Sequence, residues 1–232
     1  MKKIGILGGM APESTLEFYR QLTSLAQEAL PGRIYPTIII YSLNMDEFRI
    51  PLNSGNYQGA ISVLSHGIHA LSRAGAEFAI IASNTPHMFF FELANNSPIT
   101  LLSIVTETAQ EAKRRGFSRV GLYGTRFTME SNFYSDEFGR QGMSVVAPGE
   151  EGRGYIHEKA MGELADGKIV ESTKERFIEI TRNMIDQNGI QALILGSTEL
   201  PLILNEKALG IPVLDTTRIS VQAAFDYAQD KP

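Results

Sequence analysis

The chain repeats one sequence pattern about halfway along its length. A hydrophobic run leads to Ser83 within residues 80–85, and a second hydrophobic run leads to Ser197 within residues 193–199. Ser197 lies 114 positions after Ser83, and the same offset relates two further pairs, Gly75 with Gly189 and Pro98 with Pro212. A period near half of the 232 residues is far longer than the periods of solenoid repeats, so it indicates two copies of one whole domain. We therefore expect two pseudo-symmetric domains.

The starts of the two halves also correspond, because residues 3–8 match residues 119–124 in sequence. A composition with 43% hydrophobic and 20% charged residues allows each half to bury its own core, and domains of roughly 100 to 150 residues are common. We expect an N-terminal domain at 1–100, onto which a C-terminal helix at 216–232 packs back, and a second domain at 101–215.

Strands and helices alternate in the expected secondary structure. Short β-branched segments bounded by Gly or Pro predict strands at 4–7, 37–41, 78–82 and 99–104, and then at 120–123, 144–147, 192–195 and 213–214. Helical spacing of apolar residues predicts helices at 16–29, 59–72, 106–115, 153–165, 172–188 and 219–229. This alternation predicts an α/β fold with two parallel sheets, each covered by helices on both faces.

In open parallel sheets, ligands bind beyond the carboxyl ends of the strands. Four segments occupy such positions, namely Gly8-Gly9-Met10, Ser83-Asn84-Thr85, Gly124-Thr125 and Ser197-Thr198-Glu199. We expect them to share one active-site cleft between the two domains.

Several of these residues also have a purely structural interpretation. Gly8-Gly9 either offers backbone amides to a carboxylate or phosphate, or forms a tight turn between strand and helix. The segment Ser83-Asn84-Thr85-Pro86 is typical of a helix start. Thr198 is in the same way a candidate helix cap, with Glu199 in the first turn. The symmetric repetition of the serines favours a functional site.

Four basic side chains need separate consideration. His87 follows Ser83 by four residues, and it is either a hydrogen-bonded packing residue or a general base for Ser83. Arg49 is either a clamp for a substrate carboxylate or a solvated loop residue. His66 and His69 lie on one expected helix without a third ligand, and the chain has no cysteine, so we expect no metal.

Charge and hydropathy narrow the classes of partner. The net charge is -5 and the sequence has no stripe of Lys and Arg, which argues against nucleic acid or an anionic membrane as partner. The apolar run that follows Lys2 and Lys3 contains three glycines and is broken by Pro12, so we expect a first strand and not a secretion signal. No apolar stretch approaches the roughly 20 residues that span a bilayer. A cytoplasmic protein is expected.

Three motifs together resemble one known family. Gly8-Gly9-Met10-Ala11-Pro12-Glu13-Ser14-Thr15, Ser83-Asn84-Thr85-Pro86-His87 and Gly196-Ser197-Thr198-Glu199-Leu200 look like the motifs of the aspartate/glutamate racemases. The resemblance implies a racemase that needs no pyridoxal phosphate or other cofactor, acts on aspartate or glutamate, produces D-amino acids and forms a homodimer. It also implies catalytic roles for the two residues that stand at the family's cysteine positions, Ser83 and Ser197. Substrate-binding roles are implied for Met10, Arg49, Asn84, Thr85, Thr125, Thr198 and Glu199.

The replacement of both family cysteines by serine bears directly on turnover. A racemase without a cofactor needs two acid/base groups on opposite faces of the α-carbon, and a cysteine thiol with a pKa of about 8.5 suits this role far better than a hydroxyl. The chain is therefore expected to be a weakened or inactive Cys-to-Ser form. The alternatives are a non-catalytic protein that binds an amino acid or dicarboxylate, a related diacid isomerase or decarboxylase, and an enzyme in which His87 activates Ser83 as a nucleophile.

Overall fold

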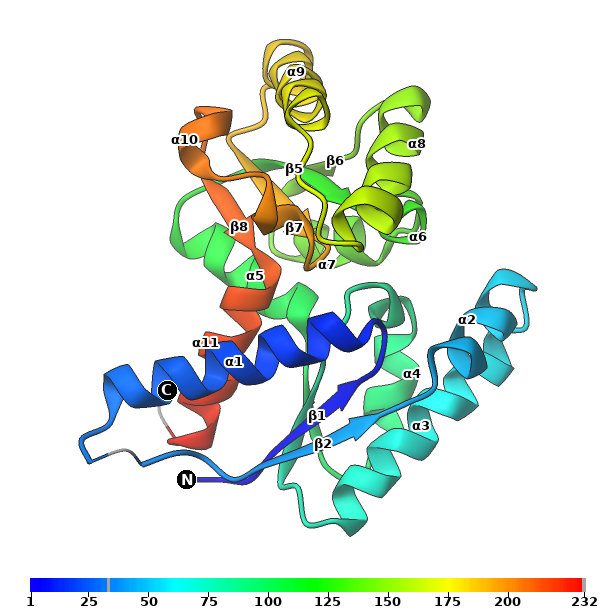
Figure 1. Cartoon of the computed structure of the whole chain (residues 1–232), viewed down its shortest axis with the longest axis vertical. Helices are drawn as coiled ribbons and strands as arrows, with labels where there is room; N and C mark the ends of the chain where they lie inside the picture. The colour runs from blue at the N-terminus through cyan, green and yellow to red at the C-terminus, as the bar shows by residue number, and fades with distance from the viewer. Residues whose placement is uncertain (33, 231–232) are drawn as a thin grey trace. The chain divides into compact units, whose positions relative to one another are not determined.

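The computed structural model of the protein describes residues 1–32 and 34–230 (Figure 1). The chain divides into two compact units, one formed by Met1–Ile104 with Thr217–Pro232 and the other by Val105–Thr216. Residues 231 and 232, which the expected helix 216–232 includes, lie outside the described residues. Within the described part, no helix is both long enough and apolar enough to cross a membrane.

The first unit is built on a parallel sheet. Its elements are β1 (Ile4–Gly8), α1 (Pro12–Ala29), β2 (Ile38–Ser42), α2 (Met45–Asn53), α3 (Tyr57–Arg73), β3 (Phe78–Ile81), the 3₁₀ turn η1 (Thr85–Phe89), α4 (Phe90–Asn95), β4 (Thr100–Leu102) and the last helix α11 (Thr216–Ala228). The described residues form a four-stranded sheet in the order β2-β1-β3-β4, and every pair of neighbouring strands is parallel.

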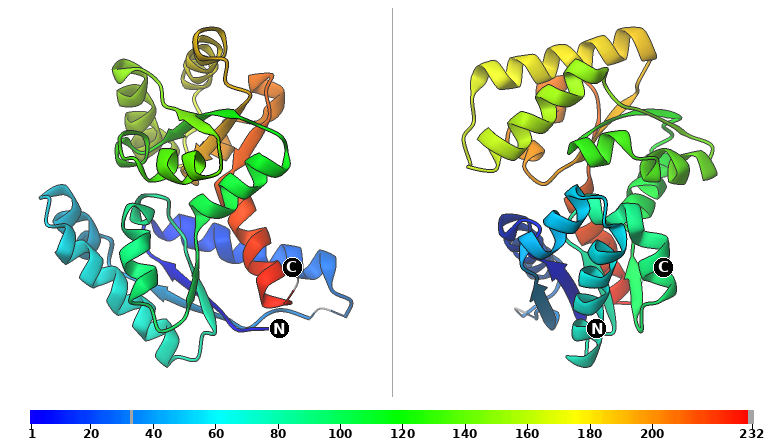
Figure 2. Two further views of the ribbon diagram at one scale, coloured as in Figure 1. Left: turned by 180° about the vertical axis from the view of Figure 1, so that it is seen from behind. Right: turned by 90° about the vertical axis from the view of Figure 1, so that its right-hand side faces the viewer.

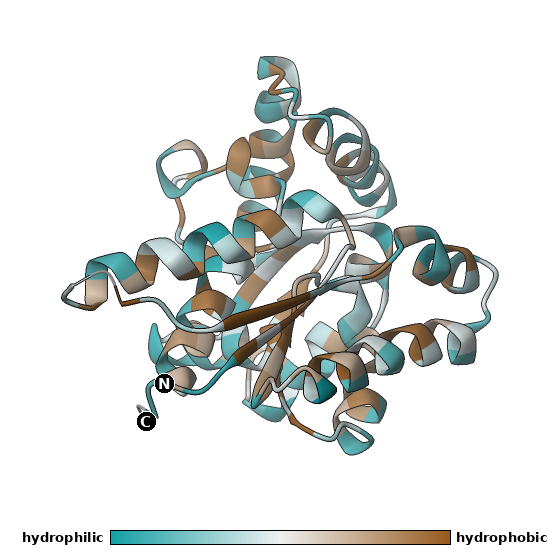
Figure 3. Ribbon diagram, turned by 60° about the horizontal axis from the view of Figure 1, so that its bottom comes forward, coloured by the Kyte–Doolittle hydropathy of each residue, from teal (hydrophilic) through white to brown (hydrophobic). Residues whose placement is uncertain are grey.

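Helices cover both sides of this sheet. Figure 1 shows α1 and α3 on opposite sides of β1 and β2. Helix α1 buries Phe18, Leu22 and Ala26, which are spaced four residues apart and so share one face of the helix. Helix α3 approaches through Gly67, where a Cβ atom would lie only 2.5 Å from Leu7. The strands are the most hydrophobic part of this unit, and polar residues line the outer side of α1 (Figure 3).

The last helix also belongs to the first unit. The Tyr227 ring of α11 packs edge-on against Phe78 of β3 with 4.7 Å between the ring centroids. The Lys2 amide donates to the carbonyl oxygen of Ala228 at 2.8 Å. The C-terminal part of the described chain therefore packs against β3 and against the residues just before β1.

The second unit repeats the same architecture. Its elements are α5 (Ile104–Arg114), β5 (Arg119–Gly124), α6 (Arg126–Glu130), α7 (Phe133–Arg140), β6 (Ser144–Val146), α8 (Glu150–Lys159), the π-helical turn η2 (Ala160–Leu164), α9 (Glu171–Asn188), β7 (Ala192–Gly196), the 3₁₀ turn η3 (Leu200–Leu202), α10 (Glu206–Leu209) and β8 (Val213–Asp215). Its described strands form a four-stranded parallel sheet in the order β6-β5-β7-β8. The order matches that of the first sheet strand for strand, so the predicted α/β fold with two parallel sheets is confirmed.

Aromatic residues join α8 and α9 to the second sheet. The buried Tyr123 hydroxyl of β5 lies 3.0 Å from the carbonyl oxygen of Phe177 and 2.7 Å from the Thr181 hydroxyl, both on α9. Tyr155 of α8 packs perpendicular to Phe177 at 5.9 Å. Figure 2 shows α8 and α9 next to each other on the same side of the sheet. Burial raises the pKa of Tyr123, so the hydroxyl stays protonated and hydrogen-bonded.

Some expected boundaries are wrong. Helix α1 begins at Pro12 and not at residue 16, since proline fits the first turn, where its missing amide proton is not needed. The expected strand 99–104 ends at Leu102, and Ile104 begins α5. Helix α8 begins at Glu150, three residues before the expected start at 153, and becomes π-helical from Ala160 onward.

Candidate active site

The first strand of the first unit ends in a tight glycine turn. Gly9 has a φ of +89°, and a Cβ atom there would lie 2.2 Å from the Leu43 carbonyl oxygen. Its amide donates to the Thr15 hydroxyl at 2.8 Å, and the Leu43 amide donates to Gly8 O at 3.1 Å. The Gly9 amide therefore has a partner within the protein, and the two glycines form the tight turn between strand and helix that was one of the two expected interpretations. Met10, which follows the turn, is 8% exposed.

Ser83 lies just past the carboxyl end of the neighbouring strand, β3. Its position is fixed by the backbone on both sides. The amide of the preceding residue, Ala82, donates to Leu7 O of β1 at 2.9 Å. The Ser83 carbonyl oxygen accepts from His87 Nδ1 at 2.9 Å. Asn84 and Thr85 are both buried. A helical turn does begin here as expected, with Asn84 at the N-cap position and Pro86 in the first turn, but it is 3₁₀ and Asn84 makes no side-chain cap bond.

His87 is a fully engaged core residue. It is 3% exposed, and burial lowers the pKa of His87 to about 4. Because a carbonyl oxygen can only accept, Nδ1 carries the proton that goes to Ser83 O, and Nε2 accepts from the Ile104 amide at 3.2 Å. The ring also stacks on Phe90 with 5.4 Å between centroids. Both nitrogens are occupied, so the hypothesis that His87 activates Ser83 is wrong, and the packing interpretation is confirmed.

Ser197 holds the corresponding place in the second unit, directly after β7. It is 7% exposed, and its hydroxyl donates to the Glu199 carboxylate oxygen Oε2. Glu199 is half-buried, as is Thr198. The 3₁₀ turn η3 begins only at Leu200 and has no side-chain cap. Glu199 therefore precedes the turn and does not lie in its first turn as expected, and its carboxylate instead faces the serine.

Thr125 is the other candidate residue at the carboxyl edge of the second sheet, where it directly follows β5. It caps α6 by accepting from the Thr128 amide through Oγ1 at 3.2 Å. The next amide, that of Arg126, donates to His157 Nδ1 at 3.2 Å. Burial, and then the positive charge of Arg126, lower the pKa of His157, which keeps this nitrogen able to accept. Helix α8 thus holds the start of α6, and with it the Thr125 loop.

In each unit, the candidate residues gather at the carboxyl edge of the two central strands. β1 and β3 are paired in parallel, so Met10 and Ser83 follow adjacent strand ends. β5 and β7 are paired in the same way, so Thr125 and Ser197 do too. The two serines therefore occupy equivalent positions in the two sheets, each after the strand that stands third in its sheet order.

Arg49 lies apart from these strand ends. It belongs to α2, and its guanidinium is 2.8 Å from Asp46 in an ion pair whose side chains are 55% and 60% exposed. Asn44 caps this helix by accepting from the Asp46 amide at 3.1 Å. An exposed pair of this kind contributes little to stability, so Arg49 can exchange its partner for a ligand carboxylate at small cost.

Sequence reasoning missed two residues that hold this site together. Thr15, whose hydroxyl accepts from the Gly9 amide, stands in the sequence only as the last residue of the first family motif, although a Thr six residues after a glycine turn can reach back to it. His157 accepts a hydrogen bond from the amide of Arg126, the residue after Thr125. No local sequence pattern indicates this contact, because 31 positions separate His157 from Arg126.

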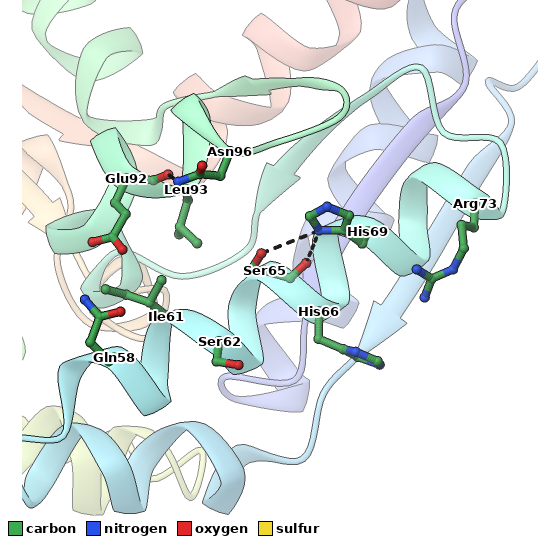
Figure 4. A pocket seen from close by; sticks show the side chains of 10 residues that line it. All are labelled: Gln58, Ile61, Ser62, Ser65, His66, His69, Arg73, Glu92, Leu93 and Asn96. Atoms are coloured by element: carbon green, nitrogen blue, oxygen red, sulfur yellow. Dashed lines mark hydrogen bonds between the residues drawn. The ribbon is translucent and has the colours of Figure 1, made fainter.

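A pocket of about 420 Å³ lies elsewhere in the first unit, between α3 and α4 (Figure 4). His69 Nδ1 donates there to the Ser65 carbonyl oxygen at 2.9 Å. His66 also lines this pocket, and its ring points in a different direction from the His69 ring. Across the described part of the chain, no group of three or more His, Asp or Glu side chains is placed to hold a metal ion.

Comparison with known proteins identifies the family. The Asp/Glu/hydantoin racemase family model matches residues 7–224. The chain belongs to this family. A crystal structure of a candidate Asp/Glu racemase from Yersinia pestis is 33% identical, with a TM-score of 0.92 over 99% of this chain and 100% of that one. An aspartate racemase homologue from Pyrococcus horikoshii OT3 is 34% identical over the same shares, with a TM-score of 0.88. The broad specificity amino-acid racemase of Bacillus subtilis (strain 168) is 29% identical over 92% of each chain.

This racemase-family chain has serine at the two positions to which the resemblance assigns catalysis. The resemblance places the family's cysteines at Ser83 and Ser197, and the whole sequence contains no cysteine. The racemase fold is thus retained with hydroxyl groups in place of thiols.

Proposed function

We propose that this protein acts on an acidic amino acid by cofactor-independent proton transfer at the α-carbon, with Ser83 and Ser197 as the two acid/base residues. The observation that carries the proposal is the equivalent position of the two serines at the carboxyl edges of two matching parallel sheets. The family match over residues 7–224 supports the reaction class. The relatives described as an aspartate racemase homologue and an Asp/Glu racemase candidate support the substrate class.

The proposed substrate contacts divide between the units. Met10, Asn84 and Thr85 belong to the first, and Thr125, Thr198 and Glu199 to the second, with Arg49 as the cation for a substrate carboxylate. Hydroxyls, amides and one guanidinium suit the two carboxylates of aspartate or glutamate. Two-base racemisation further requires that both serines act on the same α-carbon, one on each face.

Serine is a poor base by itself, and this favours a slow enzyme. A hydroxyl gives up its proton far less readily than a thiol with a pKa of about 8.5. The test is to incubate the protein with L- and D-aspartate and L- and D-glutamate in deuterated water, and to follow loss of the α-proton by NMR and change of enantiomer by chiral chromatography. The Ser83→Cys/Ser197→Cys variant should be faster by at least 100-fold.

The absence of cysteine supports a second candidate, a protein that binds an acidic amino acid without turning it over. It predicts ligand-dependent stabilisation of the native chain with no α-proton exchange at any pH. A cysteine-restored variant that binds the ligand and still leaves every α-proton in place would favour this candidate over the racemase. Homodimer formation and cytoplasmic location also stay predictions, and sedimentation velocity measures the first directly.

A further inference from the structure

We call the surroundings of Ser83 in the first unit and of Ser197 in the second unit the first and second half-sites. They differ in one chemical respect. The Ser197 hydroxyl donates its hydrogen bond to the Glu199 carboxylate. A carboxylate accepts only, so the serine proton points toward Glu199 and the lone pairs of Oγ are directed elsewhere. Ser197 is 7% exposed and Glu199 is half-buried, so the pair is sheltered while the carboxylate can still exchange its proton with water.

The corresponding groups of the first unit cannot act in this way. Two positions after Ser83, where the second unit has Glu199, the chain has Thr85, which does not ionise. The ionisable side chain that is bound to the Ser83 backbone is His87, and both of its nitrogens are engaged with the carbonyl oxygen of Ser83 and the amide of Ile104. A carboxylate that can act as a base for the serine hydroxyl is therefore built into the second half-site, whereas neither Thr85 nor His87 supplies such a base in the first.

We propose that Glu199 is the proton acceptor of the second half-site, and that Ser197 passes the substrate's α-proton to it. This inference rests on the proposed function. As the bond from Cα to its hydrogen breaks, Oγ takes that proton and releases its own to Oε2 of Glu199. The electron pair stays on the substrate, delocalised into its α-carboxylate. Reprotonation runs in reverse along the same route, and solvent deuterium reaches Cα once the proton that Ser197 took from the substrate has itself exchanged with solvent through Glu199.

A single base has a stereochemical consequence. Only the enantiomer whose α-hydrogen faces Ser197 loses that hydrogen, and the proton returns to the same face. The protein therefore exchanges the α-proton of one enantiomer with retention of configuration, and racemises it much more slowly, because racemisation also requires a proton from Ser83.

The experiment measures α-proton exchange in deuterated water separately for the D and L forms of aspartate and glutamate. The native protein should exchange one enantiomer at least 100-fold faster than the other. Glu199→Gln should lower that rate by at least 100-fold, since a general base contributes about 10²- to 10⁴-fold. The glutamine amide oxygen still accepts from Ser197, so the hydroxyl keeps its orientation and only the base is lost.

A matched variant controls for the lost negative charge. Glu158→Gln removes a carboxylate from α8 of the same unit, where it is 74% exposed and 3.5 Å from Lys159, and should leave the exchange rate unchanged. A conservative variant adds a readout that a structural role would not alter. Glu199→Asp keeps a carboxylate beside Ser197 on a shorter side chain, so it should retain more of the exchange rate than Glu199→Gln.

The cysteine-restored variant, Ser83→Cys/Ser197→Cys, separates this proposal from the proposed function. If it racemises aspartate or glutamate while the native chain exchanges neither enantiomer, the role of Glu199 is refuted and the proposed function stands. Equal exchange of both enantiomers by the native chain, or an unchanged rate in Glu199→Gln, also refutes the role of Glu199. If neither protein exchanges an α-proton, both proposals fall.

Discussion

Acidification should destabilise the protein through one buried residue, His87. Its pKa is lowered to about 4 by burial, whereas a histidine in an unfolded chain titrates near 6.5. Below pH 6.5 the unfolded chain therefore binds a proton that the folded chain does not. The folded state loses stability as the pH falls from about 6.5, and the loss is complete once the pH is below about 4.

The size of this effect follows from the difference between the two pKa values. A gap of about 2.5 units at roughly 1.4 kcal/mol per unit gives a total loss of about 3 kcal/mol, most of it already present at pH 4.5. The structure explains why the folded pKa is low. The ring is buried, Nε2 already accepts from Ile104, and protonation would put a donor against that amide.

His87→Gln is the variant that isolates this contribution. Glutamine keeps a donor and an acceptor but does not titrate, so at pH 7 it should cost about 1–3 kcal/mol through poorer hydrogen bonds. Urea unfolding followed by circular dichroism, at several pH values from 8 to 4.5, measures the stability of both proteins. The advantage of the native chain over the variant should shrink by about 2.5 kcal/mol across this range. Carboxylates titrate in both proteins and cancel in the difference. Two curves that stay parallel down to pH 4.5 would refute the reasoning.

Three further substitutions test other parts of the structure. Gly9→Ala should destabilise the protein by more than about 2 kcal/mol in thermal unfolding, because it adds a Cβ at a φ of +89° only 2.2 Å from a backbone oxygen, whereas Gly116→Ala, at a φ of +78° with open space around it, should cost about 1 kcal/mol. Tyr123→Phe should cost about 1 kcal/mol in urea unfolding, since it removes a buried, hydrogen-bonded hydroxyl. Arg49→Ala should weaken binding of aspartate or glutamate at least tenfold by calorimetry with unchanged stability. Arg20→Ala, which breaks an ion pair on α1 whose arginine is 65% exposed, should leave binding unchanged. Equal affinities in the two variants would remove Arg49 from the site.

The strands of both sheets could be predicted from the sequence because their signals are local. The central strands β1, β3, β5 and β7 are short apolar runs that end at glycine or at a serine motif, and the repeat predicts that the two halves have the same elements. The order of the strands within each sheet comes from the structure. Helix α2 was missed for an equally local reason. Its nine residues contain Pro51, and their apolar residues form no extended stripe, so neither composition nor spacing indicates a helix there.

The ends of helices and strands that depend on tertiary contacts could not be predicted from local sequence patterns. Residues 99–104 look like one β-branched strand, yet the strand ends at Leu102 and Ile104 starts a helix. The Ile104 amide is bound by His87 from 17 positions earlier in the chain. A bond between two such distant residues leaves no trace in the local pattern, and neither does the bond between Arg126 and His157.

In the candidate site, too, some features could be predicted from the sequence and others depend on the structure. The placement of Ser83 and Ser197 at strand ends followed from the repeat and from the family resemblance. The partners of these residues did not, because they depend on side-chain geometry. Ser197 and Glu199 are two positions apart and could face each other or point apart, and only the structure shows the hydroxyl directed at the carboxylate.

The central claim is that Ser83 and Ser197 are the acid/base positions of an enzyme that acts on the α-carbon of an acidic amino acid. The most direct measurement is the incorporation of solvent deuterium at that carbon by the Ser83→Cys/Ser197→Cys variant, followed for both enantiomers of aspartate and glutamate. We expect deuterium in both enantiomers together with racemisation, and slower racemisation when only one of the two cysteines is restored. A folded, cysteine-restored protein that leaves every α-proton in place would contradict the account.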